Sequence, residues 1–488
     1  MMTFPVRAVS TSPTAYKITG GHELRRWRMG KGVEVEGAEY SDAYKRGHWD
    51  GRIYPGYRMT MSPRGTPILY AKAGLLPALQ AAFPDMVVEN QHTPPSYPSL
   101  KGVLRGAPHR LRDYQVETLG AMMSHRWGRV ALATNAGKGA IIGLFCAACE
   151  AVGLRSLVVC DSVAVFDALR EEVCDWGGME EVGLVEAGAE DPPQTLTTIG
   201  MVPTLHRRRD RPAWMLWLSE VDVLLLDEAD QATASMWGKL LDACCNSYWR
   251  FGFSGTFPDS GTVAHLKLEE YVGPILTEVR NKDLVEREIS AKPFVSFLPV
   301  KHDLGRDRPE GWAEMSAIQK RQWVFDEAVV HNPARHHLIR SRLDAEGKNV
   351  IIVRRIAHGE ELEDCISGSV FISGSTPRKR REEVVEAWRG GEHPTLIVTN
   401  IMDRGTNRLG WAGKVIMASG EGSDRQTLQR IGRGLRRSGG KVYVEFEDIM
   451  DTGHRYLRKQ ARKRVRLYND EGFDTFIAPT TTNADTET

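Results

Sequence analysis

The stretch of sequence that decides the fold is VALATNAGKGA, residues 130–140. An apolar strand here runs into a loop that contains glycine and lysine, and an apolar helix follows. Such a loop turns backbone N–H groups and a helix N-terminus toward an anion, and its lysine reaches the outer phosphates of a nucleotide. The stretch therefore predicts a phosphate-binding loop with these members: Thr134, Asn135, Ala136, Gly137, Lys138, Gly139 and Ala140.

Two positions of this loop depart from the usual pattern. Leu132 stands where the first glycine is expected, and Gly139 replaces the serine or threonine whose hydroxyl contacts Mg²⁺. An octahedral Mg²⁺ keeps several waters, so a water can take the place of that hydroxyl. We therefore expect ATP hydrolysis to survive the loss, and the alternative is a nucleotide-binding, DNA-junction-binding protein that is impaired in hydrolysis.

A second apolar strand delivers acids about ninety residues later, in VLLLDEAD at 223–230. The carboxyl ends of parallel strands form the mouth of a sheet, where the ligands of α/β proteins bind. Asp227 can hold Mg²⁺ through a water, and Glu228 can orient and deprotonate an attacking water. Together with the phosphate loop, these acids predict a site that hydrolyses a nucleoside triphosphate.

Two series of apolar strands alternate with helical segments, at 112–271 and from 349 onward. Continuous apolar strands of this kind indicate parallel sheets covered on both faces. Residues 1–95 instead have short strands separated by turn residues, which is typical of a small α+β domain. We therefore expect an α/β fold with these divisions: an N-terminal domain (1–95), a first lobe (96–277), a connector (278–335), a second lobe (336–470) and an acidic, polar, disordered tail (471–488).

The chain has 488 residues, with 64 Lys and Arg against 63 Asp and Glu, so its formal net charge is only +1. This balance excludes a polyelectrolyte partner bound over the whole surface, but it permits a narrow basic track. The sequence has no apolar run of membrane-spanning length and no signal-peptide core, so we expect no membrane association. Seven cysteines, mostly within apolar runs, suit a reducing cytoplasm and lack zinc-finger spacing.

Further motifs follow in a fixed order: LRDYQ at 111–115, FSGT at 253–256, a segment at 399–405, and QRIGRGLR at 429–436. In this order and spacing the chain resembles the superfamily-2 helicases. The resemblance implies two RecA-like lobes that form a helicase motor, with ATP and Mg²⁺ bound between them. It also implies roles for the motif residues, as follows: Arg112 and Gln115 bind adenine; Asp230, Ser254, Thr256 and Gln429 couple hydrolysis to strand movement; Thr399 contacts nucleic acid; Gly405 contacts nucleotide; Arg433 and Arg436 are arginine fingers.

Four stretches outside the motor motifs resemble the UvsW-type phage helicases, at 44–53, 73–77, 284–293 and 464–473. Enzymes of that type remodel branched DNA in recombination-dependent replication and repair. The resemblance therefore implies that the chain binds DNA forks and junctions, alongside other recombination or replication proteins, in the host cytoplasm if the chain is viral. The DEAD spelling at 227–230 leaves an RNA helicase open, and the motor subunit of a restriction nuclease would need a partner chain.

Basic residues gather in two places that could contact DNA. Residues 1–100 hold 12 Lys and Arg against 8 Asp and Glu, and Arg46, Trp49 and Arg52 cluster within them. Cations contact phosphates and an aromatic ring among them can stack on an unpaired base, although Trp49 could instead lie in the core of its domain. A helix expected at 455–468 has seven cations and no acid, and we expect its Arg458 and Arg462 to contact DNA.

Overall fold

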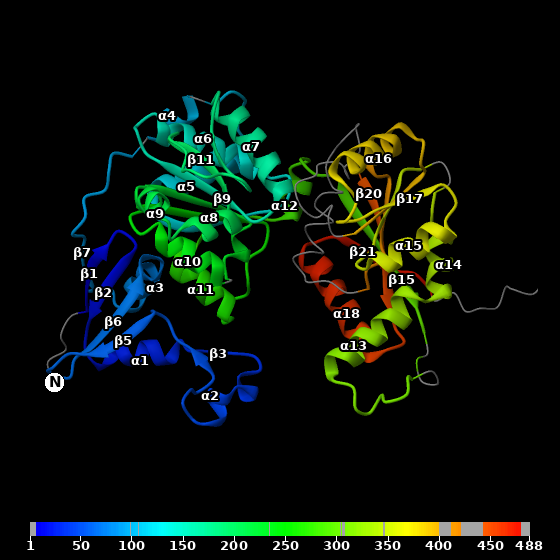
Figure 1. The fold of residues 1–488 in the computed structure, drawn as a ribbon, viewed down its shortest axis with the longest axis horizontal. Coiled ribbons are helices and arrows are strands. Elements are labelled where there is room, and N and C mark those ends of the chain that lie inside the picture. Colours follow the sequence, from blue (N-terminus) through cyan, green and yellow to red (C-terminus); the bar gives the residue numbers. More distant parts are fainter. Residues whose placement is uncertain are drawn as a thin grey trace, which may run out of the picture. The chain divides into compact units, whose positions relative to one another are not determined.

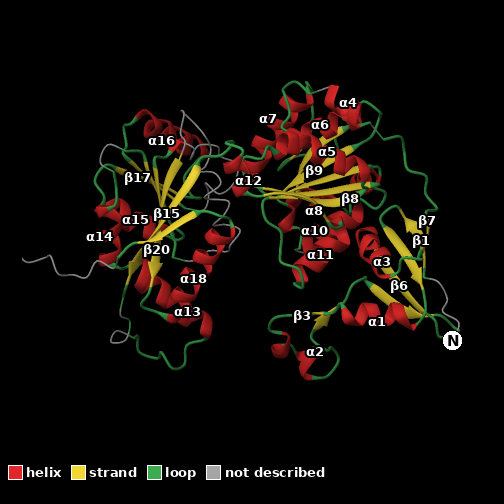
Figure 2. Ribbon diagram, turned by 180° about the vertical axis from the view of Figure 1, so that it is seen from behind, coloured by secondary structure: helices red, strands yellow, loops and turns green. Residues whose placement is uncertain are grey.

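The computed structural model describes residues 6–97, 99–105, 107–233, 235–302, 304, 308–344, 347–399, 411–420 and 443–479. The chain divides into two units: Met1–Leu132 with Gly137–Val279, and Ala133–Ala136 with Arg280–Thr488. The first unit holds the N-terminal domain and the first lobe, and the second unit holds the second lobe (Figures 1 and 2). Within the described ranges, every helix is too short or too polar to cross a membrane.

The N-terminal domain is built on a mixed five-stranded sheet with strand order β5-β6-β2-β1-β7. β1 pairs with β7 in parallel, and the other neighbours are antiparallel. Leu24 of α1 (His22–Gly30) and Leu79 of α3 (Leu76–Ala82) lie in the core of this domain. The remaining elements are β1 Arg7–Ser12, β2 Ala15–Thr19, β3 Val33–Glu34, η1 Ala38–Tyr40, α2 Asp42–Lys45, β4 Arg52–Ile53, β5 Arg58–Met61, β6 Pro67–Lys72, η2 Ala73–Leu75 and β7 Val87–Glu89.

The first lobe is built on a seven-stranded parallel sheet with strand order β10-β11-β9-β12-β13-β8-β14. Its five central strands are buried along their whole length because helices cover both faces: α6 and α7 lie on one side, and α8, α10 and α11 on the other (Figures 1 and 2). The strands are β8 Trp127–Leu132, β9 Ser156–Cys160, β10 Gly183–Val185, β11 Thr197–Met201, β12 Val223–Asp227, β13 Trp249–Ser254 and β14 Ile275–Val279. The helices are α4 Leu100–Arg105, α5 Asp113–Ser124, α6 Lys138–Glu150, α7 Val163–Gly177, α8 Val202–Arg208, α9 Pro212–Ser219, η3 Ala229–Gln231, α10 Ser235–Ala243 and α11 Val263–Val272.

The second lobe repeats this architecture with strand order β17-β18-β16-β19-β20-β15-β21, again all parallel. Trp388 and Tyr468 bring α16 and α18 onto one face, and Ile339 and Leu362 bring α14 and α15 onto the other. The strands are β15 Lys292–Val300, β16 Asn349–Ile352, β17 Ser369–Ile372, β18 Thr395–Val398, β19 Lys414–Met417, β20 Tyr443–Asp451 and β21 Asp474–Ile477. The helices are α12 Asn281–Glu286, α13 Ala317–Phe325, η4 Asp326–Val330, α14 Pro333–Ser341, α15 Ile356–Cys365, α16 Arg378–Gly390 and α18 Arg455–Asp470.

Two of the expected divisions are wrong. The connector 278–335 contributes β15, which lies between β20 and β21 and is therefore an integral strand of the second lobe. The tail expected to be disordered from residue 471 contributes β21, and Phe473 beside it is buried. Both strands form because partners far away in the chain supply their hydrogen bonds, and neither segment shows the continuous apolar run by which the central strands were predicted.

The N-terminal domain packs directly on the first lobe. A Cβ atom on Gly74 would lie 2.7 Å from the backbone oxygen of Glu270 in α11, so only glycine allows this close approach. Lys72 forms an ion pair with Asp242 at 2.5 Å, and the Gly56 backbone N–H donates to the Glu270 carboxylate at 2.7 Å. The stretch 73–77, one of those that carried the resemblance to the UvsW type, therefore serves to dock the domain.

Candidate nucleotide site

The phosphate loop lies where the sequence predicts it, between the end of β8 at Leu132 and the start of α6 at Lys138. Asn135 and Gly137 adopt left-handed backbone conformations with φ of 77° and 80°, and the Ala136 N–H donates to the Ala133 carbonyl at 3.1 Å. Thr134 and Asn135 are half-buried, whereas Ala136 and Ala140 are buried. The loop thus curls so that the N-terminus of α6 opens at the carboxyl edge of the sheet.

Lys138 lies beside the two acids that follow β12. Its Nζ is 3.4 Å from the Glu228 Oε1 and 3.7 Å from the Asp227 Oδ1, and all three side chains are less than one-fifth exposed. Burial by itself lowers the pKa of Lys138, but the Glu228 and Asp227 carboxylates outweigh burial and the net pKa is raised. Burial also raises the pKa of Asp227, against the opposing charge of Lys138. The predicted cation and both predicted acids are therefore brought together.

The residues at this place suit a divalent cation held jointly with phosphate oxygens. The Asp227 Oδ1 is buried and has no hydrogen-bond partner among the described residues, so it is available as a ligand. Carboxylate oxygens are the ligands that Mg²⁺ prefers, and Mg²⁺ usually takes only one or two of them from the protein. The described part of the chain offers no group of three or more His, Cys, Asp or Glu residues that could hold a metal. Because Mg²⁺ takes only one or two carboxylates from a protein and the rest of its ligands from phosphate and water, the single Asp227 carboxylate fits Mg²⁺ that arrives with a nucleotide.

The structure explains why glycine, and not serine or threonine, stands at position 139, which the sequence alone did not show. A Cβ atom there would overlap the carboxylate of Glu172 on α7, and it would lie 2.7 Å from the Glu172 Cβ and 2.8 Å from its Cδ. One turn further along α6, a Cβ on Gly143 would lie 3.1 Å from the Val173 Cα. Glycine at both positions lets the two helices pack closely, and Glu172 fills the volume that a serine or threonine at 139 would need.

Gln115 lies against the phosphate loop. Its side-chain Oε1 accepts a hydrogen bond from the Arg112 backbone N–H at 2.9 Å, and its Nε2 occupies the space that a Cβ on Gly137 would enter. The Arg112 side chain donates to the Tyr114 hydroxyl at 2.9 Å. Gln115 is 3% exposed, so it ties the start of α5 to the loop. Contact of Arg112 and Gln115 with adenine stays a prediction.

Three of the four residues predicted to couple hydrolysis to movement, Asp230, Ser254 and Thr256, meet at or just beyond the ends of β12 and β13. The Ser254 Oγ is 2.8 Å from the Asp230 Oδ1 and accepts a hydrogen bond from the Thr256 N–H at 3.2 Å. Ser254 has one hydroxyl proton, and the Asp230 carboxylate is the stronger acceptor for it. Glu228 has a φ of 52°, a costly conformation for a residue other than glycine. The acid strand and the FSGT strand are therefore linked directly beside Glu228.

The predicted DNA-contacting residues have different surroundings. Arg46, Arg458 and Arg462 are exposed. The Trp49 Nε1 donates to the Arg52 carbonyl at 2.8 Å, and the Arg52 guanidinium pairs with Glu34 at 2.7 Å, so both residues stabilise the paired strands β3 and β4; their contact with DNA stays a prediction. The sixth residue of this group, Thr399, is 7% exposed.

Four residues singled out by motif lie outside the described part of the chain. They are Gly405, Gln429, Arg433 and Arg436. Their predicted contacts with nucleotide and with the first lobe stay predictions.

Two parallel-sheet lobes, with the predicted phosphate loop and the strand-end acids in the first, define the two-lobed RecA-like fold of the superfamily-2 helicases. Residues 108–259 match the family described as type III restriction enzyme, res subunit, and residues 334–438 match the helicase conserved C-terminal domain. The chain therefore belongs to the superfamily-2 helicases.

Its relatives include two curated DNA helicases. The Drosophila melanogaster general transcription and DNA repair factor IIH helicase/translocase subunit XPB is 23% identical, over 74% of this chain and 46% of that protein. The ATP-dependent DNA helicase uvsW of Enterobacteria phage T4 is 21% identical, over 53% of this chain and 54% of that protein. The chain thus spans about half of the length of these relatives.

A solved structure shares the fold. Saccharomyces cerevisiae Dbp5 bound to RNA and ADP BeF3 superposes with a TM-score of 0.51 at 16% identity, over 78% of this chain and 93% of that one.

Proposed function

We propose that this protein is an ATP-dependent DNA helicase or translocase that remodels branched DNA. The observation that carries the proposal is the position of Lys138 between Asp227 and Glu228 at the mouth of the first sheet. A lysine already paired with two acids exchanges those partners for phosphate oxygens at little cost. The names of the DNA helicases among its relatives support DNA as the substrate.

The chain's own residues supply most of the hydrolytic chemistry in this proposal. The N–H groups of the loop and Lys138 bind and orient the phosphates. Asp227 would hold Mg²⁺ together with the phosphate oxygens, and the bound ion would supply positive charge against the charge that develops on the transferred phosphoryl group. Glu228 orients the attacking water and takes its proton. The hydrogen bond between Asp230 and Ser254 carries a change at the acids to the β13 strand end.

DNA is gripped through its backbone in this proposal. Six cations on α18 are exposed, and they recur at helical spacing: Arg455, Arg458, Lys459, Arg462, Lys463 and Arg466. Phosphate contacts carry no sequence information, so recognition is by structure. If each cation contacted one phosphate, the logarithm of the affinity would fall with a slope of roughly −5 against the logarithm of salt concentration. The tightly docked N-terminal domain, with exposed Arg46, directs the motor toward forks and junctions.

The cellular setting follows from the same proposal. A motor that remodels branched DNA would act in the cytoplasm, that of a host cell if the chain is viral, beside other recombination or replication proteins.

The test is ATP hydrolysis with forks, Holliday junctions, single strands, duplex DNA and RNA at two salt concentrations. We expect wild type to be stimulated most by branched DNA, and Lys138→Ala to lose turnover in every case. A matched control is Lys267→Ala, because Lys267 lies on α11 and its Nζ donates to the Thr233 carbonyl, away from the loop. Stimulation by RNA above all DNA substrates would contradict the choice of nucleic acid.

A second candidate function is favoured by the packing of Gly139 against Glu172. With that volume filled, the site lacks the usual hydroxyl ligand, and the protein would bind a DNA junction and nucleotide without turnover. Binding of a fluorescent ATP analogue that depends on Lys138, together with no DNA-stimulated hydrolysis in wild type, would select this function over the motor.

A further inference from the structure

Helix α18 (Arg455–Asp470) has two chemically different faces. The six exposed cations lie on its outer face, and its inner face buries Leu457, Ala461, Arg464 and Tyr468. Arg464 belongs to the basic run in the sequence, but it is only 3% exposed. The basic run therefore contains one cation that points into the second lobe.

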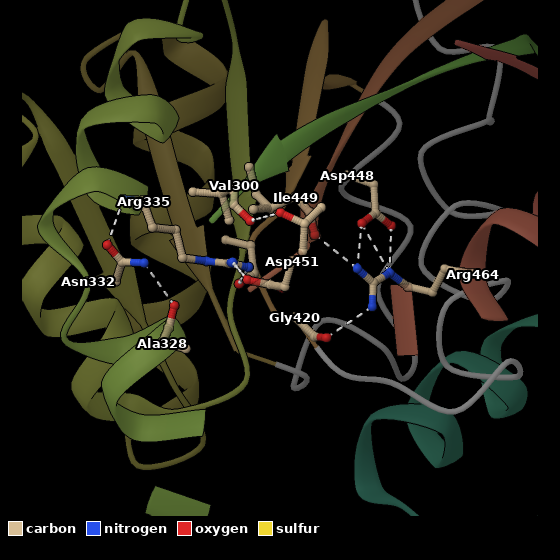
Figure 3. A network of polar contacts seen from close by, with 11 residues as sticks. Val300, Ala328, Asn332, Arg335, Gly420, Asp448, Ile449, Asp451 and Arg464 are labelled. Carbon is tan, nitrogen blue, oxygen red and sulfur yellow. Dashed lines mark hydrogen bonds and ion pairs between the residues drawn. The ribbon is translucent and has the colours of Figure 1, made fainter. Parts of the chain in front are cut away.

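Arg464 is bound on all sides within the lobe (Figure 3). Its Nε and Nη2 donate to the carboxylate of Asp448 on β20 at 2.8–3.0 Å, and its Nη1 donates to the Gly420 carbonyl at 3.0 Å. The Tyr468 hydroxyl donates to the same carboxylate at 2.7 Å. One guanidinium thus joins α18, β20 and the turn 418–420 that follows β19.

A second buried arginine reaches the same turn from the opposite side of the sheet. Arg335 of α14 pairs with Asp451 of β20 at 2.5 Å, and its Nη2 donates to the Ala418 carbonyl at 2.9 Å (Figure 3). Gly420 has a φ of 63°, and a Cβ there would lie 3.0 Å from the Val329 Cγ2. We call Arg335, Asp451, Arg464 and Asp448 the turn clamp.

Stability alone does not account for this arrangement. Burying charge is costly, and a buried ion pair can often be replaced by apolar residues of similar volume without loss of stability. What apolar residues cannot do is donate hydrogen bonds to the Ala418 and Gly420 carbonyls. These carbonyls lie at the carboxyl edge of the sheet, where ligands of α/β folds bind. The clamp therefore fixes the point from which the chain continues into residue 421.

We propose that the turn clamp couples DNA contact on the outer face of α18 to DNA-stimulated ATP hydrolysis. This inference rests on the proposed function. Arg464 and Arg335 are positioning residues in it: a load on the outer cations moves α18, Arg464 moves with the helix, and the Gly420 carbonyl follows. The residues after Gly420 include Gln429, Arg433 and Arg436, so the turn is the place at which motion of α18 enters that part of the chain.

The test compares two ion pairs whose acids are buried at adjacent positions of β20, Asp448 with the buried Arg464 and Glu447 with the partly exposed Arg342. The clamp variant is Arg464→Met with Asp448→Leu. It removes the donor to the Gly420 carbonyl and fills the space of the ion pair with apolar side chains of similar volume. The control is Arg342→Met with Glu447→Leu, because Arg342 pairs with Glu447 at 2.5 Å and neither side chain bonds to the turn. For each protein we would measure the melting temperature, the affinity for a fork by fluorescence anisotropy, and ATP hydrolysis against fork concentration.

We expect the clamp variant to bind the fork with the affinity of wild type, because the outer cations remain. Its maximal DNA-stimulated rate should fall roughly 2- to 30-fold, the range seen for residues that carry coupling. The control should keep the wild-type rate. Equal maximal rates in the clamp variant and wild type would overturn the inference.

A milder variant decides the matter if the double clamp variant does not fold. Arg464→Lys keeps the charge beside Asp448 but replaces the guanidinium fork, which contacts Gly420 through Nη1 and Asp448 through Nη2, with a single nitrogen on a shorter reach. It should show the same split, with wild-type affinity and a reduced maximal rate. An unchanged maximal rate would overturn the inference. A wild-type protein that no DNA stimulates would instead contradict the proposed function on which the inference rests.

Discussion

Gly139→Ala gives a direct test of the packing that explains the unusual phosphate loop. The added Cβ would overlap the Glu172 carboxylate and would lie 2.7 Å from the Glu172 Cβ. The carboxylate can swing away, but the Glu172 Cβ is fixed by the α7 backbone, so α6 and α7 must separate. Val173 and Gly143, one turn further along, resist that separation because they are also in close contact.

The magnitude follows from two opposing effects. Alanine is favoured over glycine in a helix by roughly 0.5–1 kcal/mol, whereas overpacking a close contact costs typically about 1–3 kcal/mol. We therefore expect Gly139→Ala to lower the free energy of unfolding by about 1–2 kcal/mol. For a unit of this size that corresponds to a fall in the melting temperature of roughly 2–8 °C.

The assay is calorimetric melting of the full chain, with Gly120→Ala as the matched control. Gly120 lies within α5 of the same lobe, and a Cβ there would meet the Leu100 Cδ2 at an ordinary 3.7 Å. The control should melt at or slightly above the wild-type temperature. Glu172→Ala, which removes two of the three nearest atoms, should recover part of the loss in the double variant. If Gly139→Ala were as stable as Gly120→Ala, the close packing of α6 and α7 would be refuted.

The same geometry predicts how the missing hydroxyl can be restored. Gly139→Thr alone should not raise ATP hydrolysis, because the side chain has no room beside Glu172. Gly139→Thr with Glu172→Ala should raise it relative to Glu172→Ala alone. A rate increase in the single variant would show that the site tolerates the hydroxyl without rearrangement.

Two further predictions concern the docking of the N-terminal domain. Burial raises the pKa of Glu270 to about 7 from its ordinary 4.5. Between these two pH values the carboxyl group is protonated in the folded protein and ionised in the unfolded chain. The free energy of unfolding of wild type should therefore fall as pH rises from about 4.5 to 7. Glu270→Gln should remove that decline, at most about 1.4 kcal/mol per pH unit, and melting temperatures across this range would show it. Gly74→Ala should weaken the docking of the N-terminal domain on α11 and speed limited proteolysis between that domain and the first lobe. The control is Gly21→Ala, which should cleave at the wild-type rate because a Cβ at position 21 would lie in open space. Equal cleavage rates in the two variants would contradict the docking.

Local pattern was enough to find the central strands and the chemistry at their ends. Within the two predicted series, the apolar stretches at 156–160, 395–398 and 414–417 form β9, β18 and β19, because each is apolar after its first residue and is buried there on both sides. Lys138, Asp227 and Glu228 followed from the same runs, since chemistry in parallel α/β sheets gathers at the carboxyl ends of strands. Ser254 and Asp230 were assigned to coupling by their motifs, and the hydrogen bond between them came from the structure.

Pattern failed where a residue's role depends on a partner far away in the chain. The segments that form β15 and β21 lack a continuous apolar run. β15 is a strand because it pairs with both β20 and β21, and β21 is a strand because it pairs with β15. In the sequence Arg464 is one of seven cations of a basic helix, and only the structure shows that it is buried against Asp448. Local bonds also involve Trp49 and Arg52, which bond to each other and to Glu34, and the contact of these two residues with DNA stays a prediction.

The sequence by itself determined the class of fold and predicted the residues of the nucleotide site, because buried strands and the phosphate loop each occupy a contiguous stretch of a few residues. Only the tertiary structure decided why Gly139 departs from the pattern, where Arg464 points, and how the N-terminal domain is attached. Each of these depends on the approach of two backbones or two side chains that are distant in sequence, such as Gly139 with Glu172 and Gly74 with Glu270. Such contacts are determined by close packing in the folded protein, and they cannot be predicted from composition or from the periodicity of the sequence.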